Sequence, residues 1–235
     1  MSVFRKSPPL SAASQRSACS LIKLGGSLLQ SDHSDGAQCA GSNRGSVVDR
    51  LLALVDREEL LNVAVLVGGG EAADLVRRWD RQFGLSDSVA HTLAIESMSL
   101  NAKLLASLHD RLVLVNSLAE WRSTHDSSPD TVAILHPTNI VAELELIHAA
   151  LPQSWDVTSD SLAAWIAVCC RVPQLLLLKS TDIDVSAVEH ARVALATVLA
   201  DSGVVDSQFP QIACDVEHFA WCNFRAPACR TLALW

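Results

Sequence analysis

A lysine followed at once by a glycine turn is the stretch of this sequence best suited to phosphate chemistry. Leu21 to Leu29 is a short apolar run that contains Lys23 and then opens into Gly25, Gly26 and Ser27. The run predicts a buried strand, and the glycines predict the tight turn from that strand into a helix. Glycine lets the backbone approach a ligand closely, and N–H groups at a helix start attract anions. With the charge of Lys23, these residues indicate a phosphate-binding site, although the sequence contains no Walker A loop.

Three further features follow predicted strands or begin predicted helices. Gly68–Gly70 comes directly after the apolar run Val63–Val67. Lys179 comes directly after the run of four leucines at 175–178. Asp156–Asp160 precedes an apolar helix. In open α/β sheets, ligands bind outside the carboxyl ends of the strands, so we expect all four features to meet at one edge of the sheet.

The hydrophobic pattern alternates between strands and helices. This alternation predicts an α/β fold, namely a three-layer αβα sandwich with a mainly parallel central sheet. We expect one domain over residues 21–235 and a flexible N-terminal tail over residues 1–20. In the helix 71–83 we expect Trp79 to face the core, and in the helix 161–170 we expect Ser159 or Asp160 to be the N-cap. Further strands are expected at 21–24, 63–67, 112–115, 131–135 and 175–178, and further helices at 47–59, 88–108, 141–150 and 188–199.

Composition excludes several classes of protein. The chain has 235 residues, 49% of them hydrophobic, and a formal net charge of −8. This acidic balance argues against a nucleic-acid partner. The seven cysteines have no zinc-type spacing, which indicates reduced thiols in a cytoplasmic protein, and no apolar run is long enough to span a membrane.

At these motifs the chain resembles the amino acid kinase family, which includes acetylglutamate, carbamate, glutamate-5, aspartate and uridylate kinases. The resemblance implies the carbamate kinase-like fold, ATP and Mg²⁺ as cofactors, a small anionic acceptor and a homo-oligomer. The matching segments are Lys23–Ser27, Val67–Gly70, Thr158–Asp160 and Leu178–Asp182.

The resemblance also implies a role for each matching residue. Lys23, Asp160 and Lys179 would be catalytic: the lysines would neutralise the phosphoryl group in transfer, and the aspartate would hold them in place. Nucleotide binding is expected from Gly25, Gly26, Ser27, Lys179, Thr181 and Asp182. Acceptor binding is expected from Gly68, Gly69, Gly70, His91, Ser154, Trp155 and Thr158. No protein ligand to a metal is expected, because Mg²⁺ would bridge nucleotide oxygens.

The residues themselves agree with this chemistry and leave alternatives open. Phosphoryl transfer needs alignment and neutralisation of charge, and an aspartate between two lysines keeps both charged. A purely structural interpretation is also available for Asp160 as a helix cap, for Lys179 as a solvated strand end, and for His91 as an ordinary helix residue. Ser154 and Trp155 could equally pack a loop.

Within the family, Leu151–Trp165 and Ala90–His91 are similar to a branch of methanogens and methylotrophs. That branch contains the kinase for [5-(aminomethyl)furan-3-yl]methyl phosphate in methanofuran biosynthesis, so an aminomethylfuran phosphate is the expected acceptor. Uridylate kinase-like or acetylglutamate kinase-like activity is one alternative. A second alternative is a non-catalytic protein that binds nucleotides or oxyanions, because Ser180–Ser186 has no glycine where many relatives shape the nucleotide loop.

Overall fold

The computed structural model describes residues 19–30, 43–127, 130–185 and 191–235. The expected N-terminal tail lies, except for its last two residues, outside the described residues. The part of the predicted helix 188–199 that precedes residue 191 also lies outside them. In the described part of the chain, no helix is both long and apolar enough to cross a membrane.

Within the described residues, seven strands form one sheet with the order β3-β4-β2-β1-β5-β6-β7. All neighbouring pairs are parallel except β6 and β7, which are antiparallel. The strands are β1 (Ser20–Leu24), β2 (Val63–Val67), β3 (Leu112–Val115), β4 (Val132–Leu135), β5 (Gln174–Lys179), β6 (His218–Asn223) and β7 (Thr231–Ala233).

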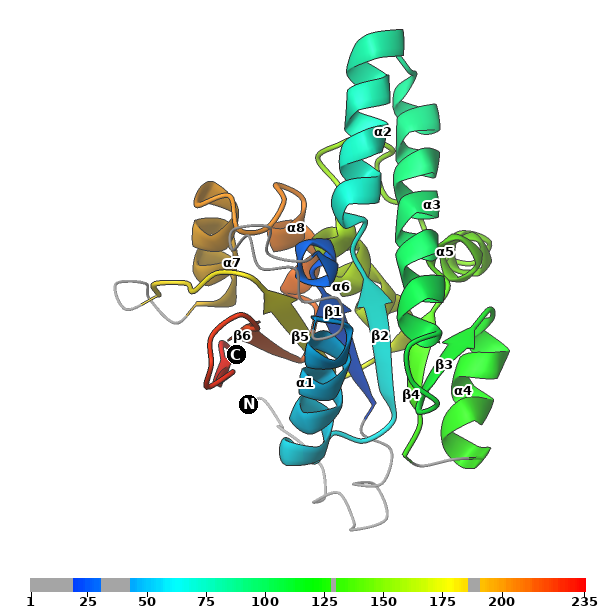
Figure 1. The fold of residues 1–235 in the computed structure, drawn as a ribbon. Helices are drawn as coiled ribbons and strands as arrows, with labels where there is room; N and C mark the ends of the chain where they lie inside the picture. Colours follow the sequence, from blue (N-terminus) through cyan, green and yellow to red (C-terminus); the bar gives the residue numbers. More distant parts are fainter. Residues whose placement is uncertain (1–18, 31–42, 128–129, 186–190) are drawn as a thin grey trace, which may run out of the picture.

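Helices cover both faces of this sheet, and Figure 1 shows α2 and α3 side by side, extending well beyond it. The helices are η2 (Gly26–Leu29, a 3₁₀ turn), α1 (Asn43–Arg57), α2 (Gly70–Phe83), α3 (Asp87–Ala106), α4 (Leu118–Ser127), α5 (Pro137–Glu145), α6 (Ser159–Cys170), α7 (Arg192–Asp201) and α8 (Phe209–Ala213). The fold is therefore the three-layer α/β sandwich that the alternation predicts.

Two hydrophobic clusters, one on each face of the sheet, hold these layers together. One contains Leu21 of β1 with residues of α5, α6 and α8, and the other contains Ile22 and Leu24 with residues of α1. Successive side chains of a strand point to opposite faces. Lys23 therefore points to the same face as Leu21, toward the layer that holds α6.

Most of the expected elements are confirmed, with shifts of a few residues. The helix predicted for 141–150 instead begins at Pro137, which fits proline's preference for a first turn. The tight turn after Lys23 leads into η2, a single 3₁₀ turn, and not into the expected α-helix. The sequence interpretation missed α4, β6 and β7, and it also missed α8, where only a turn at Phe209 and Pro210 was expected.

Two expectations about individual side chains are wrong. Trp79 is 40% exposed, because α2 extends past the sheet and has no further layer to pack against on that side. The N-cap of α6 is Thr158, whose hydroxyl accepts a hydrogen bond from the Asp160 N–H at 3.3 Å. The Asp160 carboxylate is thereby available for other partners.

His136 is a buried polar residue between β4 and α5. It is 7% exposed, and its Nδ1 has no hydrogen-bond partner among the described residues. Burial lowers the pKa of His136 below the ordinary value of 6.5, and the charge of Lys103 acts in the same direction. The folded protein therefore favours the neutral imidazole.

This pKa difference predicts a loss of stability at acidic pH. As the pH falls below about 6.5, the unfolded chain takes up a proton that the folded chain resists, so the free energy of unfolding decreases by at most about 1.4 kcal/mol per pH unit. We expect His136→Gln to lessen this decrease, as measured by urea denaturation at about pH 7.5 and about pH 5.5. His148→Gln, at an exposed position, is the control. Equal pH dependence in the wild type and His136→Gln would contradict the assignment.

Candidate active site

Lys23 lies in β1, an interior strand of the sheet, and is the fourth of the five residues of this otherwise mostly apolar strand. Its neighbours across the sheet are Leu66 of β2 and Leu177 of β5, and Lys23 is only 4% exposed. Burial lowers the pKa of Lys23, and the nearby Asp160 carboxylate offsets only part of this effect. A lysine in such surroundings needs a close anionic partner, because an unpaired buried charge is very costly.

Asp160 is that partner, and it bridges two lysines. Its Oδ1 lies 2.7 Å from Lys23 Nζ, and its Oδ2 lies 2.7 Å from Lys179 Nζ. Burial alone would raise the pKa of Asp160, but the two ammonium groups outweigh it and hold this pKa below its ordinary value. The three residues, which we call the Lys–Asp–Lys group, carry one net positive charge in a mostly buried position.

The fold explains how these residues meet. Lys23 and Lys179 belong to adjacent parallel strands, β1 and β5, and Lys179 is the last residue of its strand. Asp160 is in the first turn of α6, which packs over these strands. The amino end of a helix also favours a carboxylate. The sheet edge, as predicted, therefore brings Lys23, Asp160 and Lys179 together.

Asp206, which the sequence interpretation missed, fixes the start of α6. Its Oδ2 accepts hydrogen bonds from the Thr158 N–H at 3.0 Å, the Thr158 hydroxyl at 2.7 Å and the Ser161 N–H at 3.1 Å. Its Oδ1 accepts from the Ser161 hydroxyl and from the N–H groups of Gln208 and Phe209 at the start of α8. One carboxylate thus joins two helix starts and positions the turn that carries Asp160.

The two glycine turns pack against each other through their backbones. A Cβ on Gly26 would overlap the backbone nitrogen of Gly70, and a Cβ on Gly68 would lie 2.8 Å from the Gly26 nitrogen. Gly70 also has a φ of +52°, which side chains rarely tolerate. Glycine is required here for packing as well as for any contact with a ligand.

Hydrogen bonds fix the orientation of these turns. The Gly25 N–H donates to the Leu178 carbonyl at 2.9 Å, so Gly25 shapes the turn and does not present this donor to a ligand. Asn101 of α3, also missed from the sequence, donates through Nδ2 to the carbonyls of Gly68 and Gly69 at 2.8 and 2.9 Å. Holding both carbonyls toward α3 fixes the conformation of the second glycine turn.

Two cavities lie on either side of the Lys–Asp–Lys group. The first, which we call the Lys23 cavity, has a volume of about 330 Å³ and is lined by Lys23 and all three glycines of the second turn. The second, the Lys179 cavity, has about 310 Å³ and is lined by Lys179 and Asp206. Asp160 borders both, so two separate ligands could meet at this group.

The outer wall of the Lys23 cavity comes from α2, α3 and the loop before α6. Trp155 of this loop donates a hydrogen bond through Nε1 to the Asp80 carboxylate at 2.8 Å. The Arg77 guanidinium lies 4.8 Å from the centre of the Trp155 ring. Arg77 Nη1 also lies 2.8 Å from Asp74 Oδ1. Burial lowers the pKa of His91, which lines the same cavity, so its neutral form is favoured at pH 7.

The remaining predicted residues lie in different places. Gly26, Ser27 and Thr158 line the Lys23 cavity, and Thr158 also lines the Lys179 cavity. Thr181 and Asp182 are exposed residues just beyond β5 and line neither cavity. Ser154 does not line either cavity, but its backbone forms a hydrogen bond with His91. Asp74 and Arg77 look like ordinary surface charges in the sequence, and no local signal distinguishes them.

Comparison with known proteins agrees with this geometry. The family model described as the amino acid kinase family matches residues 19–184. The chain is 28% identical over 128 residues to the [5-(aminomethyl)furan-3-yl]methyl phosphate kinase of Methanocaldococcus jannaschii. This match spans 54% of the chain and 55% of the relative, about half the length of each.

Solved structures support the fold. The UMP kinase of Ureaplasma parvum superposes with a TM-score of 0.62 at 13% identity, covering 90% of this chain and 92% of that one. The uridylate kinase of Archaeoglobus fulgidus superposes with a TM-score of 0.58 at 17% identity, covering 86% and 89%. At these identities the likeness concerns the fold alone.

The hydrogen bonds of Asp206 predict a measurable role in stability. Asp206→Asn replaces one acceptor oxygen by an amide donor, so several buried N–H and hydroxyl groups lose their partner. We expect the free energy of unfolding to fall by about 3 kcal/mol in urea denaturation. The control is Asp201→Asn, at the exposed end of α7. Unchanged stability in Asp206→Asn would show that the junction of α6 and α8 does not depend on this carboxylate.

Proposed function

The chain belongs to the amino acid kinase family, and on this premise we propose that it transfers the γ-phosphoryl group of ATP to a small, phosphate-bearing acceptor. One observation carries the proposal: a buried Lys–Asp–Lys group with net positive charge separates two cavities. A phosphoryl group passing between two ligands would lie beside this charge.

The proposed mechanism depends on charge and alignment. In phosphoryl transfer, negative charge spreads over the equatorial oxygens, and preorganised cations in a poorly solvated site stabilise it. Lys23 would face this charge from the acceptor side and Lys179 from the nucleotide side. Asp160 would keep both lysines charged and in place. A phosphate oxygen of the acceptor is already an anion, so it needs no general base.

The Lys179 cavity is the proposed nucleotide side. Mg²⁺ would enter with ATP, bound to phosphate oxygens and water, as is usual for this ion. Among the described residues, no three His, Cys, Asp or Glu side chains gather as a metal site, and both Asp160 oxygens are engaged by lysines. As the sequence indicates, the segment Ser180–Ser186 after Lys179 contains no glycine.

For the acceptor, we favour [5-(aminomethyl)furan-3-yl]methyl phosphate. The support is the activity for which the M. jannaschii relative is named and the size of the Lys23 cavity, which suits a small ring with a phosphate group. UMP is the second candidate, supported by the fold likeness to UMP kinases. Acetylglutamate and a non-catalytic, nucleotide-binding role are the remaining alternatives. We further propose that the protein acts in the cytoplasm and takes part in the biosynthesis of a C1 carrier.

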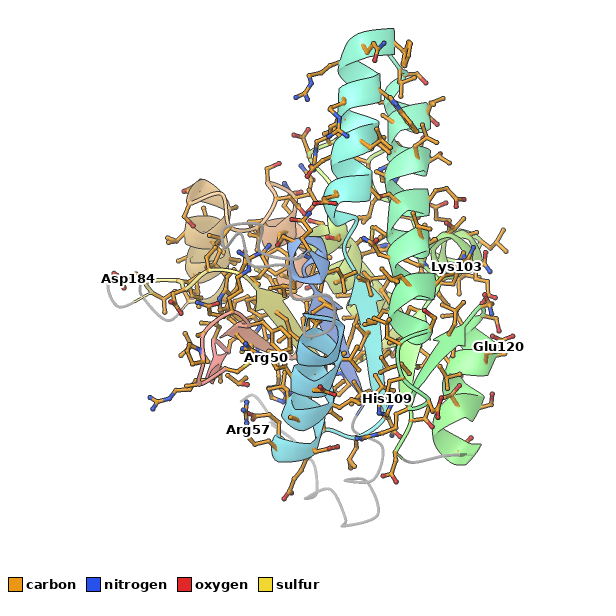
Figure 2. All side chains as sticks on the ribbon, in the orientation of Figure 1. Arg50, Arg57, Lys103, His109, Glu120 and Asp184 are labelled. Atoms are coloured by element: carbon orange, nitrogen blue, oxygen red, sulfur yellow. The ribbon has the colours of Figure 1, made fainter. Side chains whose placement is uncertain are left out.

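Substitution of the two lysines tests the mechanism. Lys23→Met keeps the side-chain volume and leaves Asp160 paired with Lys179, so we expect a folded protein whose kcat is about a hundred- to thousandfold lower. Lys179→Met should raise the KM for ATP more than the KM for the acceptor. Phosphoryl transfer is measured with both candidate acceptors by product chromatography. Lys103→Met, on the exposed side of α3 (Figure 2), is the control.

Two outcomes would overturn these assignments. Wild-type kcat in Lys23→Met would reject the role of Lys23. Calorimetry that shows ATP binding by the wild type, with no turnover of any candidate acceptor, would favour the non-catalytic alternative.

We also propose a homo-oligomer in which a second copy covers part of α3 and the edge strand β3. Leu100 and Leu104 lie one turn apart on α3 and are 61% and 48% exposed, and Val113 of β3 is 40% exposed. Exposed apolar groups of this size, next to the edge strand of the sheet that the described residues form, are typical of surfaces that associate.

Sedimentation can test this association. We expect the wild type to sediment at a multiple of the monomer mass, and Leu104→Glu to shift the population toward monomer, because a charge cannot be buried without a partner. The control is Val193→Glu, which places the same charge at an exposed apolar position on α7. A monomeric wild type, or equal behaviour of the two variants, would contradict the proposed surface.

A further inference from the structure

The Lys23 cavity has two chemically different ends. Its inner end is formed by Lys23 and the second glycine turn, and its outer end contains Asp74, Arg77 and His91. An α-helix rises 1.5 Å per residue, so Asp74 and Arg77 lie roughly 6 and 10 Å along α2 from the turn at Gly70. A small acceptor that reaches Lys23 with its phosphate therefore places its other end beside these residues.

The middle of the cavity is apolar and would not bind a charge. Ala73 of α2, three residues of α3 (Ala94, Ile95, Met98) and Val157 line it. These side chains suit a small, flat ring, and they leave polar recognition to the two ends.

Charge differs in sign between the two ends. The Lys–Asp–Lys group gives the inner end a net positive charge. At the outer end, Arg77 is paired with Asp74, and Asp80, which does not itself line the cavity, adds a second carboxylate that accepts a hydrogen bond from Trp155 Nε1. The outer end and the groups bonded to it thus contain two carboxylates, Asp74 and Asp80, and one guanidinium, Arg77. Their formal net charge is negative.

Hydrogen-bonding capacity at the outer end also favours a donor. The contact with Arg77 is to Asp74 Oδ1, which leaves Oδ2 as an acceptor, and the side chain of Asp74 lines the cavity and is 54% exposed overall. Arg77 itself is held between Asp74 and the face of Trp155. Neutral His91 has one N–H and one acceptor nitrogen, and it already bonds to the Ser154 backbone.

We propose that the outer end of the Lys23 cavity is a subsite for a primary ammonium group, with the Asp74 carboxylate as its anchor. The acceptor is then a zwitterion that enters with its phosphate toward Lys23 and its ammonium group toward Asp74. This inference rests on the proposed kinase function, and it separates the two acceptor candidates: an aminomethyl-bearing phosphate fits both ends, whereas UMP has no cation for the outer one.

Binding and turnover of a matched pair of ligands test the subsite. The first is [5-(aminomethyl)furan-3-yl]methyl phosphate, and the second is the same molecule with a methyl group in place of the aminomethyl group. Calorimetry measures binding, and product chromatography measures phosphoryl transfer. We expect Asp74→Asn to weaken binding of the amine about tenfold or more, and to raise its KM similarly, while the methyl analogue and ATP are unaffected. Glu71→Gln, an exposed carboxylate in the first turn of α2, is the control.

The outcomes separate the two claims. If Asp74→Asn affects both ligands equally, or neither, while transfer continues, the ammonium subsite is rejected and the kinase function stands. If the amine binds the wild type, more weakly in Asp74→Asn, but neither ligand is phosphorylated, the subsite stands as a binding site and the kinase function is rejected. If the wild type binds the two ligands equally, the subsite is rejected whatever the turnover.

Discussion

The bridge from Asp160 to two lysines is the interaction on which the site depends. Lys23 occupies a ladder position between two leucines, where an unpaired ammonium group would cost several kcal/mol. Asp160 makes this position tolerable, and it does so without neutralising the site, because two cations share one carboxylate. The remaining positive charge is held in a poorly solvated place at the carboxyl edge of the sheet. A phosphoryl group, which is an anion, would balance this remaining positive charge.

Close backbone packing of the two glycine turns forms part of the site around the Lys–Asp–Lys group. The turn after β1 and the turn after β2 touch at Gly26 and Gly70, where neither position has room for a side chain. Asn101 holds the second turn from α3, and Asp206 holds the start of α6 from the chain before α8. The site is thus fixed by hydrogen bonds from two separate parts of the chain, neither of which is adjacent to Lys23 in the sequence.

The parts of this site that could be predicted are those with a local pattern. Apolar runs indicated the central strands, and a lysine inside such a run was hard to explain without an anionic partner. Asp206 reaches Thr158 and Ser161 across 45 or more residues of sequence, and Asn101 reaches Gly68 and Gly69 across 32 or more, so no local motif marks these contacts. Trp79 shows a different limit, since periodicity tells which residues share a helix face but not whether another layer covers it. Strands β6 and β7 depend on pairing with β5 and with each other, which local composition does not reveal.

The loop before α6 connects the two cavities physically. Trp155, Thr158 and Asp160 line both of them, so one short stretch of chain forms a wall of each. On the side of the Lys23 cavity this wall is held by Asp80 and Arg77, and on the side of the Lys179 cavity it is held by Asp206. Trp155 and Asp160 thus belong to one short stretch of chain that Asp80 holds at one end and Asp206 holds at the other. Because the wall is anchored at both ends, the arrangement favours two ligands that fit a preformed site over ligands that reshape it, which is what alignment for phosphoryl transfer requires.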